Sequence, residues 1–177
     1  MDHMKTKTIG LTLAFCFLAG AVCLGADPQM GTWRLNEAKS KFAPGTSKNT
    51  MVVYKDATGG KVKITTDGFD KNGKPTHSEW TGKFDGKDYS VADDPTSDMR
   101  SYTKVDDRTL DFTAKKGGNI TVTGRVVVAA DGKSRTVTTS GTTGTAKPAP
   151  HAYQSGDFVA EEKGQKKYKN IAVFDKQ

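Results

Sequence analysis

The chain has 177 residues, of which 34% are hydrophobic and 27% are charged, and its formal net charge is +7. This length suits one domain with its own hydrophobic core. Most of the lysines are interleaved with acidic residues, a pattern that indicates a solvated surface and argues against a dedicated nucleic-acid interface.

The N-terminus has the residue order of a secretory signal peptide. Lys5 and Lys7 precede an apolar run over residues 9–24, and the small residues Gly25 and Ala26 follow. This charged, apolar and small-residue order is typical of a cleaved export signal. We therefore predict a signal peptide over residues 1–26, a mature domain over 27–177 and a periplasmic or secreted location.

Two alternatives compete with a cleaved signal. A transmembrane anchor would need about 20 apolar residues, and the run is shorter and rich in Gly and Ala. A lipoprotein signal would use Cys23, but Val22 stands where a small residue is expected. Cleavage after residue 26 removes Cys16 and Cys23, so the mature chain would be free of cysteine, which is ordinary for a bacterial periplasmic protein.

The mature chain reads as a succession of short strands separated by tight turns. Turn signals such as Asn72-Gly73, Asp85-Gly86 and Asp131-Gly132 recur at short intervals, without a long helical period between them. This spacing predicts an antiparallel meander, which tends to close when it is long. The expected strands are residues 30–36, 49–55, 61–67, 76–84, 87–92, 99–105, 109–115, 119–129, 134–142 and 168–176.

Alternation within these segments predicts which side chains face the core. Val62, Ile64 and Thr66 share one face of their strand. Residues 110, 112 and 114 share one face of the expected strand 109–115. Residues 120, 122, 124, 126 and 128 share one face of the expected strand 119–129, and Arg125 lies on the opposite face. Such period-two patterns are typical of half-buried strands. Gly82 and Gly124 lie inside strands, where glycine often marks a bend.

Two stretches interrupt the meander. Residues 37–47 contain Phe42 and Pro44-Gly45, and we expect a short helical turn that caps one end of a barrel. Residues 141–165 are rich in Thr, Gly, Ala, Pro and Lys, and are too long for an ordinary connection. This segment is expected to be a long loop, either mobile or folded over an opening.

Gly31-Thr32-Trp33 lies on the first expected strand, and residues 171–176 form the last. These two ends of the mature chain resemble those of calycins, the group that includes lipocalins and fatty-acid-binding proteins. The resemblance implies a single all-β up-and-down barrel of about 8–10 strands, closed by Gly31, Trp33 and Phe174. The mature chain is also similar to uncharacterised secreted bacterial proteins with an N-terminal Gly-Thr-Trp motif. This second resemblance rests on Gly31-Thr32-Trp33, on Phe84-Asp85-Gly86-Lys87 and on the C-terminal Val173-Phe174-Asp175-Lys176.

A barrel of this kind predicts a ligand site inside it. Aromatic and aliphatic side chains, one from each of several strands, would form the wall. The resemblance further implies an interior arginine or tyrosine that holds a carboxylate, for which Arg125, Arg135 and Tyr168 are the candidates, and a basic side chain over Trp33, either Lys169 or Lys176. The predicted ligand-binding residues are Trp80, Tyr102, Phe112, Val122 and Arg125.

Catalytic chemistry has little support in the sequence. His77 and Glu79 are two residues apart on one strand and thus share a face, but no third metal ligand is evident. The carboxylates of Asp93, Asp94 and Asp98 lack the spacing of a calcium loop. No Gly-x-Ser-x-Gly elbow is present. We therefore predict no metal and no cofactor, and the sequence leans away from an enzyme.

The sequence thus favours an exported, non-catalytic β-barrel that binds a small apolar or amphipathic molecule, with no nucleic-acid partner and no stable membrane span once the signal is removed. A second hypothesis is an envelope interaction protein that contacts anionic surfaces through its basic outer face and the lysines of residues 163–169. A third is a cavity enzyme with a site near His77 and Glu79.

Overall fold

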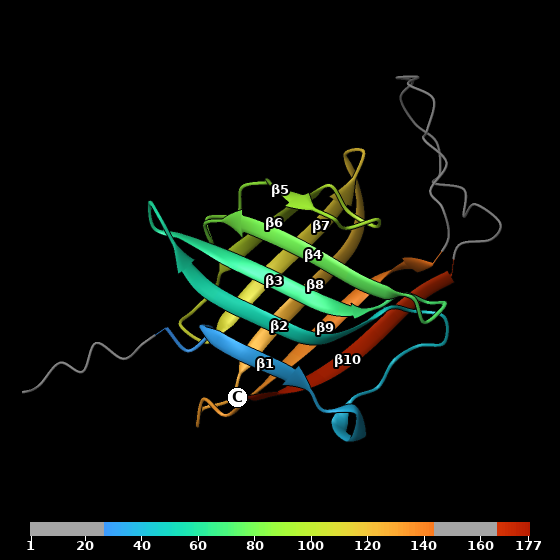
Figure 1. Ribbon diagram of the computed structural model, residues 1–177, viewed down its shortest axis with the longest axis horizontal. Coiled ribbons are helices and arrows are strands. Elements are labelled where there is room, and N and C mark those ends of the chain that lie inside the picture. The colour runs from blue at the N-terminus through green and yellow to red at the C-terminus, as the bar shows by residue number, and fades with distance from the viewer. Residues whose placement is uncertain (1–26, 144–165) are drawn as a thin grey trace, which may run out of the picture.

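The protein folds as one closed antiparallel β-barrel of ten strands (Figure 1). The computed structural model describes residues 27–143 and 166–177. The predicted signal peptide and residues 144–165 of the predicted loop lie outside the described residues. Gly141 to Thr143, which were also assigned to that loop, belong to a strand instead. In the described part, no helix is long and apolar enough to cross a membrane.

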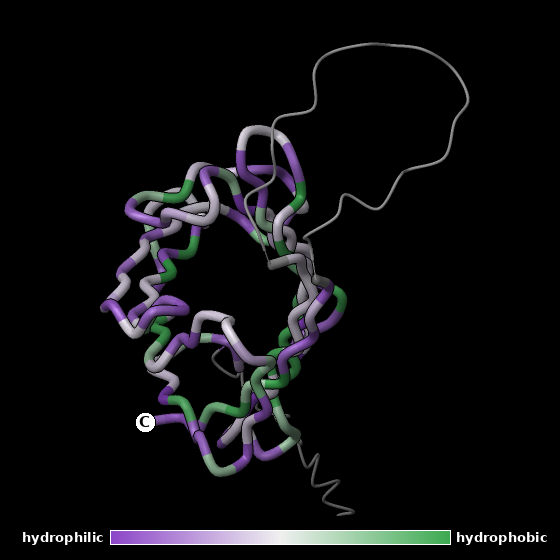
Figure 2. The backbone as a smooth tube through the Cα atoms, turned by 90° about the vertical axis from the view of Figure 1, so that its right-hand side faces the viewer, coloured by the Kyte–Doolittle hydropathy of each residue, from purple (hydrophilic) through white to green (hydrophobic). Residues whose placement is uncertain are grey.

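The ten predicted strands are all present, with ends shifted by a few residues. Each strand pairs with its neighbours in the sequence, and the first pairs with the last, so that the sheet closes into a ring (Figure 2). The strands are β1 (Gly31–Leu35), β2 (Lys48–Ala57), β3 (Lys61–Phe69), β4 (Pro75–Gly82), β5 (Tyr89–Ala92), β6 (Met99–Lys104), β7 (Thr109–Lys116), β8 (Asn119–Val128), β9 (Ser134–Thr143) and β10 (Lys166–Lys176).

The barrel is least continuous around β5. This strand has four residues, and it pairs with β4 and with β6 over two residue pairs each. By contrast, β9 and β10 pair over ten. Residues 93–98, which join β5 to β6, therefore lie beside the part of the wall that has the fewest interstrand hydrogen bonds.

The alternation predicted from the sequence sets the inside and the outside of the barrel. Val62, Ile64 and Thr66 are buried, and their neighbours on β3 are more exposed, as expected. The prediction for Ile120 is wrong, because this side chain is 61% exposed. The register of β7 with β8 shifts between Ala114 and Lys115, and this bulge reverses the facing of the residues before Val122.

Two strand glycines make room for aromatic rings. A Cβ atom at Gly124 would overlap the ring of Phe112, and one at Gly82 would come within 2.6 Å of the Tyr89 ring. These glycines therefore let large rings lie flat against the inside of the sheet. The rings of Trp80, Phe84 and Tyr102 pack in the same cluster, with Trp80 and Phe84 stacked at 6.2 Å between centroids.

One end of the barrel is closed by Trp33 and its neighbours. The indole is completely buried and donates a 2.9 Å hydrogen bond from Nε1 to the carbonyl oxygen of Gln29, which precedes β1. Lys176 lies 5.0 Å above the indole, whereas Lys169 is exposed elsewhere on β10. Phe174, on the strand that closes the ring, is also buried. We call this closed end the floor.

A short segment runs from β1 to β2 along the edge of β10, to which it is joined by backbone hydrogen bonds. It begins with the 3-10 turn η1 (Glu37–Lys39), in the stretch where a helical turn was predicted. Lys41 then forms a bridge with Ile171, and the side-chain oxygen of Asn170 accepts a 2.8 Å hydrogen bond from the backbone nitrogen of Ala43. These contacts bring Phe42 to the edge of the barrel interior.

Replacing Trp33 tests the role of the floor. We expect Trp33→Ala to lower the free energy of unfolding by about 3–5 kcal/mol, because it removes a buried indole and leaves a cavity. Val105→Ala, at a side chain that is 53% exposed, is the control and should change it by less than about 0.5 kcal/mol. Urea denaturation measures both. Equal stabilities of the two variants would contradict this role of Trp33.

Candidate functional site

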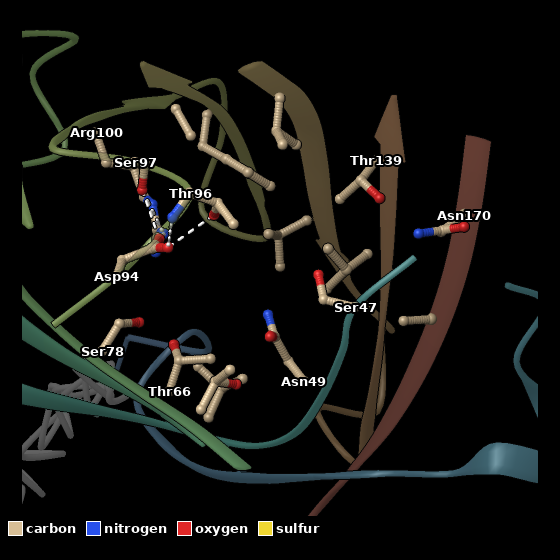
Figure 3. Close-up of a pocket in the computed structure, with 18 of the residues that line it drawn as sticks. Ser47, Asn49, Thr66, Ser78, Asp94, Thr96, Ser97, Arg100, Thr139 and Asn170 are labelled. Carbon is tan, nitrogen blue, oxygen red and sulfur yellow. Dashed lines mark hydrogen bonds and ion pairs between the residues drawn. The ribbon is translucent and has the colours of Figure 1, made fainter. Parts of the chain in front are cut away.

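The barrel encloses a cavity of about 180 Å³ that opens at the end opposite the floor. Engineered protein cavities of about 150 Å³ hold a benzene molecule, so the space suits a small organic molecule. Its lining changes in character from the floor to the mouth. Figure 3 shows this lining, with polar residues labelled. The lining includes Asn49, Tyr54, Thr66, Ser78, Asp94, Ser97, Arg100, Tyr102, Phe112, Val122, Val126, Arg135, Thr139 and Asn170.

Arg135 on β9 dominates the floor of the cavity. Its guanidinium carbon lies 4.7 Å from the ring centroids of Trp33 and Tyr54, and 5.2 Å from that of Phe174. The aromatic faces attract the cation and shield it from water. Arg135 is 2% exposed, which makes it one of the largest completely buried side chains in the described part of the chain.

The charge of Arg135 has no counter-ion among the described residues. Its Nε and Nη1 atoms are buried and have no hydrogen-bond partner there. Burial lowers the pKa of this guanidinium, and only the weaker influence of Tyr54 and Tyr102 opposes the shift. Arginine nevertheless stays protonated at neutral pH. The cavity floor is thus a buried cation with unused donors, an arrangement that costs several kcal/mol unless an acceptor completes it.

A second arginine, Arg100 on β6, lies nearer the mouth and is paired. Its Nη2 atom donates to Asp94 Oδ2 at 2.9 Å, and Ser97 donates to the same carboxylate. Burial works against the charge of Arg100, but Tyr102 and Asp94 raise its pKa overall. The pKa of Asp94 is lowered, because hydrogen bonds from Ser97 and Thr96 outweigh the effect of burial. The two arginines of the cavity therefore differ in their charge balance.

Hydroxyl and amide side chains complete the upper cavity. Asn49, Thr66 and Ser78 lie on β2, β3 and β4, and Thr139 and Asn170 lie across the cavity on β9 and β10 (Figure 3). The lower wall is instead made of apolar groups and phenol rings. Burial raises the pKa of Tyr54, so this phenol remains neutral. The cavity accordingly has a cationic floor, an apolar and aromatic middle, and a polar mouth.

Most of the residues predicted to bind a ligand point inward. Tyr102, Phe112 and Val122 line the cavity. Trp80 is buried in the aromatic cluster beside it, and its Nε1 donates to the carbonyl oxygen of Arg100 at 2.9 Å. That these residues bind a ligand stays a prediction.

Arg125 does not face the cavity. It points outward from β8, is 57% exposed and forms a bidentate ion pair with Asp111, with Nε to Oδ1 at 2.6 Å and Nη2 to Oδ2 at 2.8 Å. Of the arginines and tyrosine that the family resemblance suggested, Arg135 and Tyr168 line the cavity instead. The signal for Arg135 is its position on β9, in alternation with the inward-facing Val137 and Thr139.

His77 and Glu79 belong to an exposed charged cluster on β4, and His77 also borders the cavity. His77 Nδ1 is 2.7 Å from Asp67 Oδ1, and Glu79 forms a 2.8 Å ion pair with Lys63. The hydrogen bond to Asp67 raises the pKa of His77. Within the described residues, no group of three His, Cys, Asp or Glu side chains has the geometry to hold a metal ion. The inward-facing residues of β4 are their neighbours Ser78 and Trp80.

Comparisons with known proteins add no relative. No protein-family model, no curated protein and no solved structure matches this chain. The site is therefore interpreted from its own geometry.

Replacing Arg135 separates a binding role from a structural one. We expect Arg135→Met to leave the free energy of unfolding unchanged or to raise it by up to about 2 kcal/mol in the absence of ligand, because methionine fills the space without an unpaired charge. Arg125→Met on the outer face is the control and should change it by less than about 1 kcal/mol. A loss of several kcal/mol in Arg135→Met alone would show that the aromatic contacts of Arg135 hold the floor together.

Proposed function

We propose that the protein is an exported, calycin-like binding protein whose barrel holds one small amphipathic molecule, with an acidic group of that molecule paired with Arg135. The observation that carries this proposal is the buried guanidinium at the cavity floor, which has two unused donors and no counter-ion among the described residues. Export is supported by the signal-peptide pattern of residues 1–26.

The chemistry of the floor favours an acid over a neutral guest. A carboxylate that accepts from an unused donor of this guanidinium forms a charge-assisted hydrogen bond, which is stronger than the hydrogen bond of a neutral acceptor. Trp33, Tyr54 and Phe174 screen the guanidinium of Arg135 from water. In such a site, a carboxylate paired with this guanidinium would give an ion pair without net charge in place of an uncompensated charge. The apolar part of the ligand would then lie against Phe112, Val122 and Val126.

The size of the cavity limits the ligand. A volume of about 180 Å³ suits a molecule somewhat larger than benzene, and it is below the range of about 300–1,000 Å³ that is usual for drug-sized ligands. A short-chain or aromatic acid is therefore a better guest than a long-chain fatty acid. The proposal is a binding function, because the described lining combines a buried cation with an apolar and aromatic middle and a polar mouth.

Calorimetric titration with hexanoate and with hexan-1-ol tests the proposal. We expect hexanoate to bind at least about tenfold more tightly than the alcohol, because only the acid pairs with Arg135. Arg135→Met should lose this preference. Arg125→Met removes an arginine from the outer face of the same barrel and should bind hexanoate as the wild type does.

Two results would contradict the proposed function. One is that no short-chain carboxylic acid binds to the wild-type protein. The other is equal binding of hexanoate by the wild type and by Arg135→Met, which would place the acid elsewhere.

A further inference from the structure

Arg100, the second arginine of the cavity, bears on the far end of the ligand, and this inference rests on the proposed function. Arg100 lines the same cavity as Arg135, and its side chain is 14% exposed. Its Nε atom is buried and has no hydrogen-bond partner among the described residues. Its Nη2 atom is used, with Asp94 Oδ2 at 2.9 Å and Ser97 Oγ at 3.4 Å. One donor of this guanidinium is thus held by the protein and another is free.

The charge around Arg100 selects the kind of group that can use this free donor. Asp94 already neutralises the guanidinium, and its carboxylate is itself held by the backbone nitrogen and hydroxyl of Thr96 and by the hydroxyl of Ser97. A second anion placed here would gain a hydrogen bond from Arg100 but would also meet the negative charge of Asp94. A neutral oxygen gains the hydrogen bond without that repulsion.

The surroundings of Arg100 fit an oxygenated group better than an alkyl end. Thr66 and Ser78 place hydroxyl groups in this part of the cavity, and the amide of Asn49 lies close to them (Figure 3). Thr66 and Ser78 are each less than a tenth exposed. Burying an apolar chain end against these groups would leave them without partners, which is unfavourable.

We propose that the ligand is an acid with a neutral oxygen, a hydroxyl or a carbonyl, at the end remote from its acidic group, and that this oxygen accepts a hydrogen bond from Nε of Arg100. Arg135 and Arg100 thus recognise two different ends of one molecule. Because Arg100 is paired with Asp94, it would bind a neutral acceptor of the ligand at the mouth. Arg135 has no such partner among the described residues and would bind the anionic group of the ligand at the floor.

The test compares plain carboxylic acids with ω-hydroxy acids and with dicarboxylic acids of matched chain length, from butanoate to decanoate, by calorimetry on the wild-type protein. We expect the best ω-hydroxy acid to bind at least about tenfold more tightly than the plain acid of the same length, because it gains a hydrogen bond to a charged donor. The dicarboxylic acid should bind no better than the plain acid.

Two variants locate the effect. Arg100→Lys keeps a cation beside Asp94 and removes the Nε donor, so it should bind plain acids as the wild type does and lose the preference for the ω-hydroxy acid. Asp94→Asn removes the counter-ion of Arg100, so it should shift the preference toward the dicarboxylic acid. Circular dichroism and thermal melting establish that both variants fold.

The outcomes separate this inference from the proposed function. Binding of plain and ω-hydroxy acids with equal affinity, both dependent on Arg135, would overturn the inference and leave the proposed function standing. A preference for the ω-hydroxy acid that survives in Arg100→Lys would overturn the role of Arg100. The absence of binding by all three series would overturn the proposed function and, with it, the inference.

Discussion

A buried cation without a counter-ion among the described residues is the feature on which the proposed function depends. Arg135 is enclosed by the rings of Trp33, Tyr54 and Phe174, and two of its nitrogen atoms have no partner in the described chain. Aromatic faces attract a guanidinium, but they do not offer the hydrogen bonds that water would have given it. Under the proposed function, an acid that enters the cavity would supply the missing acceptor and recover this free energy.

The barrel is closed at one end and holds a cavity above this closed end. The indole of Trp33, the hydrogen bond to Gln29 and the pairing of β1 with β10 close the floor. Gly124 has no Cβ atom, so the ring of Phe112 can lie close against the sheet at this position. Residues 94–97 line the cavity and follow β5, which pairs over only two residues with each neighbour. Because few residue pairs hold this part of the wall, local opening costs least there.

Sequence patterns predicted the strands well, because turn residues and period-two alternation are local properties. They failed at Ile120, where a bulge that depends on pairing with β7 reverses the side-chain facing. They placed Arg125 opposite the apolar face of β8, and its exposure follows from that alternation. The unpaired state of Arg135 and the pairing of Arg100 with Asp94 could not be predicted, since both depend on which strands meet across the barrel.

The most direct test of the central claim observes the arginine side chains themselves. In a ¹⁵N–¹H NMR spectrum of the side-chain Nε–H groups, a bound acid should shift the Arg135 resonance downfield, because its Nε–H then donates to a carboxylate. The resonance of Arg125, whose Nε already donates to Asp111, should stay where it is. An Arg135 resonance that does not move while hexanoate is bound would contradict the account, because the acid would then lie away from the buried cation at the floor of the cavity.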